Sequence, residues 1–299
     1  RSKNNSPNWN RSSQCFNSTP NSPMTRVRQP ILSPPTRFIR LILCLVLLLV
    51  YHPASPSSQS AISPSDDEFL DQIEKAAWRF FWDQADQKTG LIADTNLPGS
   101  PSSIAAVGFG LTAICIAHRR GWVSSEEASR RIVTILKTFK TLLNHQHGFY
   151  YHFVDMRTGE RAWNSEISSI DTALFLAGAL FAAEYFPDTE IAQLARWLYE
   201  RVDWSWMTNG TALVSMGWRP ETGFFDAYWD WYSEGILIYA LAIGSPTHPI
   251  PPASWFTWKR TRRSYGEYPV IYSYFGSLFT YQFAHAWIDF RNLYEHEVN

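Results

Sequence analysis

The sequence has few cysteines, and their positions leave no basis for a disulfide framework. Three cysteines occur in 299 residues, at Cys15, Cys44 and Cys115. Cys15 lies upstream of Met24 and Cys44 lies inside an N-terminal apolar run, so a processed chain keeps only Cys115. Cys115 stands in the apolar sequence FGLTAICIAH, which indicates a buried, inert thiol rather than a nucleophile. The protein must therefore be held together by its core alone.

The first 61 residues lack acidic side chains. They hold seven of the 26 Lys and Arg residues and neither Asp nor Glu. The rest of the chain then carries 19 basic and 27 acidic side chains, a net charge of about −8. Nucleic-acid binding depends on Lys and Arg side chains that neutralise phosphates. The acidic body therefore excludes nucleic acid as a partner.

No apolar run reaches the roughly twenty residues that a membrane-spanning helix needs. The longest is residues 41–51, which four arginines precede and the small, polar sequence HPASPSSQSA follows. This arrangement predicts a secretory signal peptide over residues 24–61 and an exported protein, periplasmic or secreted. An inner-membrane anchor over 38–51 is the alternative, and it is the only membrane association that we expect. Residues 1–23 are rich in Asn and Ser without periodicity, and we interpret them as upstream or disordered sequence.

Alternating strand patterns are also scarce, and the chain from Ser65 onward is predicted to be all-α. A short hairpin is the exception, because alternating aromatics surround an Arg-Thr-Gly turn in residues 148–163. Ser65 is expected to cap the first helix, and Ser124 with Glu127 forms a capping box for the third. Apolar spacing predicts helices over 67–86, 104–118, 125–143, 170–183, 189–202, 234–243 and 271–287.

Nearly apolar helices alternate with amphipathic ones along the chain. This order predicts an inner ring of helices covered by an outer ring, an α/α toroid over residues 66–299. A closed six-hairpin toroid needs twelve helices, whereas about seven or eight are expected here. We therefore expect an incomplete toroid that lacks its C-terminal helices, and a chain that is unstable or inactive by itself while a longer product is active.

Aromatic and acidic side chains are concentrated in one short segment. Residues 226–235 read DAYWDWYSEG, with three acids among two tyrosines and two tryptophans, and an apolar run follows. Sugar rings stack their C–H faces on indole and phenol and offer hydroxyls to carboxylates. The segment therefore indicates carbohydrate binding, with an aromatic-rich core helix as the alternative. The expected stacking residues are Trp163, Trp218, Trp229, Trp231 and Tyr232, and the expected polar partners of the sugar are Arg219, Asp226 and Asp230.

Glycosidic cleavage needs one carboxylic acid to protonate the leaving oxygen and a second carboxylate to activate water or attack carbon. Acids in loops that lead into inner helices would reach a central cavity, where nearby rings can raise a pKa. Glu234 fits best, because an acid beside an apolar helix is costly to bury without a role. Glu166 and Asp171 take the equivalent place before 170–183. The alternative for Glu166 is a solvated residue in a polar turn. The alternative for Asp171 is a first-turn acid that the helix dipole favours.

The sequence predicts no metal site and no cofactor. His145, His147 and His152 are interspersed with Gly148 and aromatic rings rather than held at helical spacing. The motifs HExxH and CxxC do not occur.

Four segments together resemble the glycoamylase-like family of bacterial proteins. The resemblance runs in the same order from about Phe69 to the last residue. It implies an (α/α)6 toroid. The family includes inverting endo-β-1,2-glucanases and is similar to the cyclisation region of cyclic β-1,2-glucan synthases. The segments are GSPSSIAAVGFGLTA (99–113), RAWNSEISSIDTALFLAGAL (161–180), DAYWDWYSEGILIYALAIGSPTHPI (226–250) and SYFGSLFTYQFAHAWIDFR (273–291).

On this resemblance Glu234 takes the role of general acid, and the loop with Glu166 and Asp171 lines the subsites near the cleavage point. The implied activity is inverting hydrolysis of a β-linked glucan, with β-1,2-glucan as the expected substrate. A non-hydrolytic module that binds, transglycosylates or cyclises glucan is the alternative. An interaction scaffold is a third hypothesis, but a scaffold would place its aromatics on an outer patch.

Overall fold

A computed structural model describes residues 63–273 and 275–290 of the protein. The chain divides into two units, Arg1–Ala61 and Ile62–Asn299, and every described residue belongs to the second. The interpretations of 1–23 and 24–61, including the signal peptide and the alternative anchor, lie outside the described residues. Among the described helices, none combines the length and the apolar character needed to cross a membrane.

Six helices lie within a few residues of their predicted positions. A short helix, α7 (Trp204–Met207), follows the fifth of them and was not predicted. The six are α2 (Pro64–Asp83), α3 (Ile104–Arg119), α4 (Ser125–Thr141), α5 (Ser169–Tyr185), α6 (Glu190–Glu200) and α8 (Ile236–Ile243).

The helix predicted over 271–287 is wrong. Only α9 (Phe279–Gln282) and a 3-10 turn (Ala284–Ala286) occur there, and another 3-10 turn spans Pro252–Phe256. The residues before α9 include serines and Gly276, which are poor helix formers, so the apolar spacing is not enough to extend the helix.

The strands are short, and no sheet among the described residues forms a core layer, which confirms the all-α class. β1 pairs with β4, β2 with β3, β6 with both β5 and β7, and β8 with β9, all antiparallel. The strands are β1 (Ser102–Ser103), β2 (His145–Gln146), β3 (Phe149–Tyr150), β4 (Phe153–Val154), β5 (Ile167–Ser168), β6 (Gly217–Arg219), β7 (Gly223–Phe224), β8 (Arg262–Tyr265) and β9 (Tyr268–Ile271).

The predicted hairpin in 148–163 is present only as a turn. A single bridge joins Val154 to Arg161 around Gly159, whose φ of 71° suits glycine. The flanking strands pair with other segments instead, β3 with β2 and β4 with β1. The hairpin β8–β9 was not predicted, because β8 is polar and exposed and Pro269 within β9 argues against a strand.

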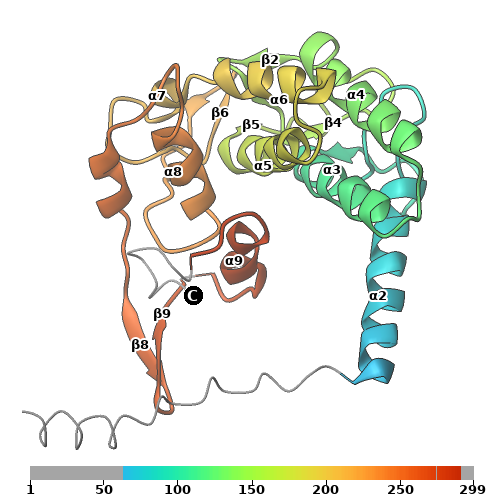
Figure 1. The fold of residues 1–299 in the computed structure, drawn as a ribbon. Helices are drawn as coiled ribbons and strands as arrows, with labels where there is room; N and C mark the ends of the chain where they lie inside the picture. Colours follow the sequence, from blue (N-terminus) through green and yellow to red (C-terminus); the bar gives the residue numbers. More distant parts are fainter. Residues whose placement is uncertain (1–62, 274, 291–299) are drawn as a thin grey trace, which may run out of the picture. The chain divides into compact units, whose positions relative to one another are not determined.

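The helices form two layers, as their alternation predicts (Figure 1). α5 packs against α3 and α8 on the inner side and against α6 on the outer side, and α4 lies on α6 and α3. α2 packs against α3. The inner helices are nearly apolar all round and the outer ones are amphipathic, since only the inner ones are covered on most sides.

Glycines allow the two central inner helices to touch at the backbone. A Cβ atom built on Gly178 of α5 would lie 2.0 Å from the carbonyl oxygen of Gly108 in α3. A Cβ atom on Gly108 would lie 2.2 Å from the carbonyl oxygen of Leu174. No larger residue fits this crossing without moving a helix.

Helix caps confirm one prediction and correct another. Oγ of Ser124 accepts the amide hydrogen of Glu127 at 3.2 Å, as predicted for α4. The cap of α2 is Ser63 rather than Ser65, and its Oγ accepts the amide hydrogen of Asp66 at 3.2 Å. Pro64 explains the earlier start, because proline is favoured in the first turn of a helix.

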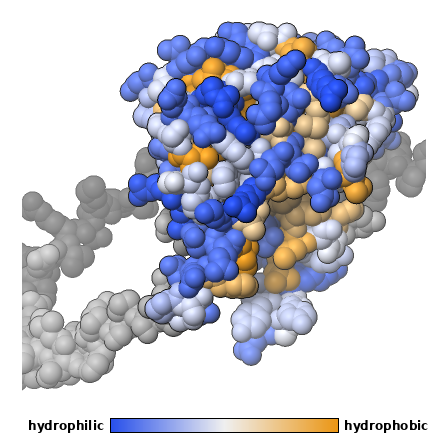
Figure 2. Space-filling model, turned by 90° about the vertical axis from the view of Figure 1, so that its right-hand side faces the viewer, coloured by the Kyte–Doolittle hydropathy of each residue, from blue (hydrophilic) through white to orange (hydrophobic). Residues whose placement is uncertain are grey.

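The N-terminal half of α2 leaves its apolar stripe uncovered among the described residues. Phe69 and Ile73 are 60% and 49% exposed, whereas Trp78 is buried. An open cavity of about 300 Å³ continues this surface between α2 and α3, with Phe109 and Trp287 among its walls. Figure 2 views the side of the molecule that carries α2 and shows apolar surface bordered by hydrophilic residues.

Candidate active site

A cavity of about 630 Å³ lies where the loop before α8 meets the chain after β9. Residues 226–234, the aromatic and acidic segment, form one wall, and Phe275 and Phe279 contribute to the other. Ligand cavities have volumes of roughly 300–1,000 Å³ and mostly apolar walls with a few polar groups. We call this space the aromatic cavity.

Glu234 is a buried acid on the wall of the aromatic cavity. Its exposed fraction is 8%, and Oε2 has no hydrogen-bond partner among the described residues. Burial raises the pKa of this carboxyl, and the negative charge of Asp171 raises it further. Glu234 therefore retains its proton to a higher pH than an exposed glutamate does.

Trp229 fixes the loop that carries Glu234. Its indole Nε1 donates a hydrogen bond to Oγ of Ser169 at 2.9 Å, and its carbonyl oxygen accepts one from the Tyr239 hydroxyl at 2.7 Å. A Cβ atom on Gly235 would lie 2.8 Å from the Trp229 ring, so only glycine fits there. The hydrogen bond to Ser169 joins the loop to the first turn of α5, which also contains Asp171.

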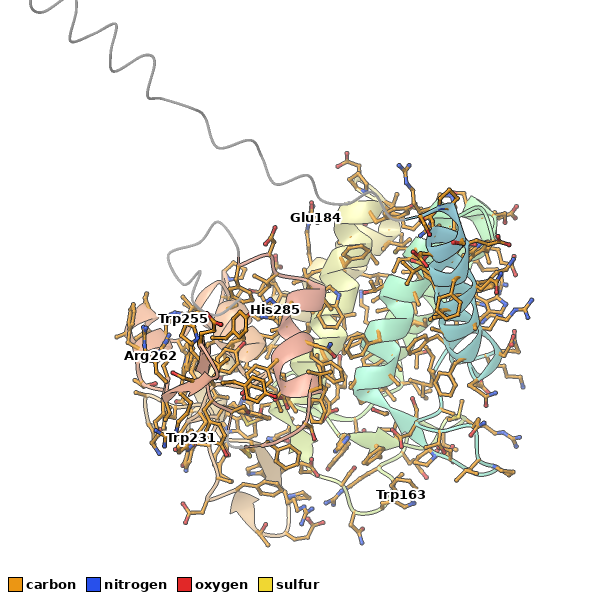
Figure 3. All side chains as sticks on the ribbon, turned by 90° about the horizontal axis from the view of Figure 1, so that it is seen from below. Trp163, Glu184, Trp231, Trp255, Arg262 and His285 are labelled. Carbon is orange, nitrogen blue, oxygen red and sulfur yellow. The ribbon has the colours of Figure 1, made fainter. Side chains whose placement is uncertain are left out.

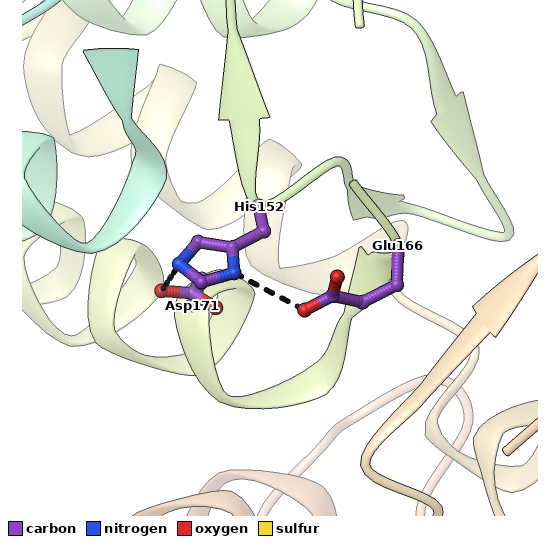
Figure 4. A group of neighbouring side chains, drawn as sticks. All are labelled: His152, Glu166 and Asp171. Carbon is purple, nitrogen blue, oxygen red and sulfur yellow. Dashed lines mark hydrogen bonds and ion pairs between the residues drawn. The ribbon is translucent and has the colours of Figure 1, made fainter. Parts of the chain in front are cut away.

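A second group of side chains lies at the start of α5, and we call it the carboxylate cluster (Figure 4). The imidazole of His152 stands between two acids, with Nδ1 at 3.1 Å from Oε1 of Glu166 and Nε2 at 3.5 Å from Oδ1 of Asp171. The backbone N–H of His152 donates to the Glu166 carbonyl at 2.9 Å. Oδ2 of Asp171 accepts from Oγ of Ser168, the N-cap of α5.

The pKa values of the three members of the carboxylate cluster shift in different directions. The hydrogen bond from His152 lowers the pKa of Glu166, assisted by the charges of His152 and Arg219. Burial raises the pKa of Asp171, although His152 and Ser168 oppose the increase. Burial also acts to lower the pKa of His152, but its hydrogen bond to Glu166 and the charge of Asp171 outweigh burial and raise that pKa.

The carboxylate cluster is better described as a hydrogen-bonded network than as a metal centre. Its possible ligand atoms lie within 4.8 Å of one another, but the imidazole directs a different nitrogen at each acid. The three groups therefore do not converge on one point. The absence of a metal remains a prediction. The other two histidines have different partners, since His145 contacts Arg201 and His147 stacks on Trp206.

Five of the predicted binding residues line the aromatic cavity, but two of them are less available than expected. Asp226, Trp229 and Trp231 stand at its wall. Asp230 also lines it, although one carboxylate oxygen is bound by Nζ of Lys259 at 2.9 Å. Tyr232 is only 1% exposed, so it serves the wall mainly by packing.

The other three predicted binding residues lie outside the aromatic cavity. Trp218 pairs with Ile167 across β5 and β6, and Nη2 of Arg219 lies 3.8 Å from Oε2 of Glu166. Trp163 is 68% exposed and contacts Phe153. In Figure 3 Trp163 lies well apart from Trp231. The sequence places Trp163 and Trp218 with the other aromatic residues by type alone. Their separation from the aromatic cavity depends on which short strands pair, and those strands are distant in sequence.

Sequence reasoning missed the contribution of His152 and Lys259. His152 was considered only as a metal ligand, although its place among aromatic residues was a signal of a half-buried ring. Ser168 and Ser169 are both candidate caps in the sequence, and the structure shows that Ser168 is the N-cap of α5. Lys259 gives no local signal, because its partner Asp230 is far away in sequence.

Residues 226–298 match the Glycoamylase family model, described as "Putative glucoamylase". The resemblance to the glycoamylase-like family is confirmed. The segment of this chain that matches the family model begins at the wall of the aromatic cavity and contains Glu234.

A curated relative and two solved structures are similar to this chain. An exo β-1,2-glucooligosaccharide sophorohydrolase (non-reducing end) from Parabacteroides distasonis is 27% identical over 218 residues, which is 68% of this chain and 30% of the relative. The endo-β-1,2-glucanase of Chitinophaga pinensis, in complex with sophorotriose and glucose, has a TM-score of 0.69 at 22% identity and shares its fold. A β-1,2-glucanase structure from Parabacteroides distasonis has a TM-score of 0.60 at 26% identity.

The matches extend over most of this chain but only part of each relative. The Chitinophaga structure is matched over 75% of this chain and 60% of its own. The Parabacteroides structure is matched over 64% of this chain and 30% of its own. The chain thus spans between about a third and three fifths of the length of these relatives.

Proposed function

We propose that this protein is a glycoside hydrolase that cleaves β-1,2-linked glucan, with Glu234 as the general acid. The observation that carries the proposal is the Glu234 carboxyl, which is buried, has an unbonded Oε2 and stands at the wall of a cavity lined by rings. The relatives named above act on β-1,2-glucans, which supports the choice of linkage.

The proposed mechanism follows from the charges around Glu234. A sugar ring stacks against Trp231 or Trp229 in the aromatic cavity, and Glu234 protonates the departing glycosidic oxygen. Burial raises the pKa of Glu234 and the negative charge of Asp171 raises it further, so the proton stays on Glu234 until the leaving oxygen accepts it. Water attacks the anomeric carbon from the face opposite the leaving oxygen and passes a proton to a second carboxylate, so the configuration inverts. Glu166, Asp171 and Arg219 complete the polar surroundings.

We also propose that the two helical layers belong to an (α/α)6 toroid. The alternation of apolar and amphipathic helices and the fold shared with the Chitinophaga enzyme support this arrangement. The leader over 24–61 supports export to the periplasm or the medium. N-terminal sequencing of the mature protein from these fractions tests the export proposal, and an uncleaved leader in the membrane fraction contradicts it.

The activity is tested with the protein expressed from its own gene and a panel of linear β-glucans, with the products separated by size. The Glu234→Gln variant should lose about 10²–10⁴-fold in kcat while it still binds glucan. Glu184→Gln is the matched control, because Glu184 is exposed at the other end of α5 (Figure 3). Full activity of Glu234→Gln contradicts the acid assignment. Cyclic products, or binding without new reducing ends, favour the non-hydrolytic alternative.

A further inference from the structure

Trp163 occupies a backbone position that is unfavourable for tryptophan. The amide of Ser165 donates to the Ala162 carbonyl at 3.0 Å, and the two residues between them, Trp163 and Asn164, have φ angles of 53° and 52°. Two central residues with positive φ are the signature of a type I′ turn, where Asn, Asp and Gly are favoured. Asn164 suits the turn, whereas Trp163 strains it.

Packing does not compensate for this strain. The Trp163 side chain is 68% exposed, and its ring contacts Phe153 with a distance of 4.9 Å between the ring centroids. A strained backbone with an exposed aromatic ring points to a role outside folding, because strain of this kind is found at functional sites. Its neighbours in the turn, Asn164 and Ser165, are polar.

Arg161 locks the turn in place. Its guanidinium donates to the carbonyl oxygens of Ser165 and Asn164, and it forms a paired salt bridge with Glu221 in the β6–β7 turn, at 2.6 and 3.2 Å. The Arg161 side chain is only 16% exposed and lies over the Tyr151 ring. The backbone of the turn that carries Trp163 is thus fixed before any ligand arrives, which lowers the entropy lost on binding.

The turn is connected directly to the carboxylate cluster. The amide of Ala162 donates to the Phe153 carbonyl at 2.9 Å, and the Phe153 ring stacks on His152 with centroids 3.8 Å apart. Trp163, Phe153 and His152 therefore form a column of rings that leads from the surface to Glu166 and Asp171. A ligand that reaches the carboxylates can continue along the exposed end of this column.

We propose that Trp163 is the stacking platform of an outer subsite for glucan, separate from the aromatic cavity and held open by Arg161 and Glu221. The inference rests on the proposed function and deepens it. The occupant is a glucosyl unit distant from the cleavage point, because an exposed indole face matches the C–H face of a sugar. A chain long enough to reach Trp163 gains this contact, whereas a short oligosaccharide does not.

The test is the ratio of kcat/KM for polymeric β-1,2-glucan to kcat/KM for a β-1,2-linked trisaccharide. The Trp163→Gly variant should lower this ratio roughly 2- to 12-fold, the range expected for loss of one aromatic contact. Its melting temperature should stay equal or rise, since glycine adopts positive φ without strain. Trp197→Ala is the matched control, because Trp197 is 41% exposed on the outer helix α6, and it should leave the ratio unchanged.

Further variants separate stacking from folding. Trp163→Phe should restore part of the ratio, and Glu221→Gln should lower it by loosening Arg161. An unchanged ratio in Trp163→Gly overturns the inference, as does an equal loss on both substrates. If the parent protein does not cleave β-1,2-glucan, the proposed hydrolase fails. Calorimetric titration with the polymer then tests the subsite by itself. Weaker binding by Trp163→Gly than by the parent supports the subsite. Equal binding by the two proteins, or no binding by the parent, refutes it.

Discussion

The indole Nε1 of Trp229 donates a hydrogen bond to Oγ of Ser169 at 2.9 Å, which joins the loop before α8 to the first turn of α5. Asp171 lies in that turn, and Glu234 lies in that loop. The contact explains how two acids 63 positions apart in the chain come close enough for the charge of one to raise the pKa of the other.

The first prediction concerns this contact. Trp229→Phe keeps an aromatic ring beside Gly235 but removes the N–H donor. We expect the free energy of unfolding to fall by about 0.5–1.5 kcal/mol, as is usual for loss of one hydrogen bond. We also expect kcat to fall more than KM rises, because the Glu234 loop loses its fixed position. Urea unfolding and steady-state kinetics measure both effects, and an unchanged kcat in a destabilised variant contradicts the positional role.

The second prediction concerns pH. Hydrolysis should fall as pH rises through the raised pKa of Glu234, because the acid loses the proton that it must donate. Asp171→Asn removes a negative charge from the surroundings of Glu234, so the pKa of Glu234 should fall and the alkaline limb of the kcat profile should move to lower pH. The profile of Glu184→Gln serves as the reference. An alkaline limb that stays in place in Asp171→Asn shows that the two acids are not coupled.

The third prediction concerns stability and His152. Its pKa is raised in the folded protein, so its protonation stabilises the fold below the unfolded value of about 6.5, and this contribution is lost as pH rises through the folded value. His152→Gln should therefore destabilise the protein by roughly 1–3 kcal/mol near pH 6, and by less near pH 9. Chemical denaturation at the two pH values measures the difference. A loss of stability that does not change with pH argues against a charged imidazole between Glu166 and Asp171.

The fourth prediction concerns the crossing of α3 and α5. Gly178→Ala places a Cβ atom against the backbone of Gly108 and should destabilise the protein by about 1–3 kcal/mol or more, because neither backbone can move freely. Gly276→Ala is the control, since nothing lies within 4 Å of its added Cβ and its φ is not positive. Thermal melting of the two variants gives the comparison. Equal melting temperatures would mean that the helices adjust at little cost.

Local signals were sufficient for most of the helical framework. The spacing of apolar residues located six helices, and Ser124 marked the start of α4 through contacts within four residues. The prediction of 271–287 failed because spacing alone does not show where serines and Gly276 interrupt a helix. The hairpin β8–β9 was missed because β8 is polar and exposed and β9 contains Pro269.

In the candidate site, too, some features follow from the local sequence and others depend on packing between distant segments. The position of Glu234 beside an apolar helix and among rings follows from a short stretch of sequence, and the cavity wall over 226–234 agrees with it. The carboxylate cluster does not follow, because His152 reaches Glu166 and Asp171 through loops between separate helices. The displacement of Trp163 and Trp218 from the aromatic cavity has the same origin, since residue type does not specify which surface a loop occupies.

The amino-acid sequence by itself determined the all-α class, the order of inner and outer helices and the concentration of rings around Glu234, because these depend on periodicity and near neighbours. Only the tertiary structure decided that His152 stands between Glu166 and Asp171, that Asp171 lies near Glu234 and that Trp163 is exposed on a strained turn. These relationships depend on how helices pack and which short strands pair, and packing brings together residues whose separation along the chain carries no signal of contact.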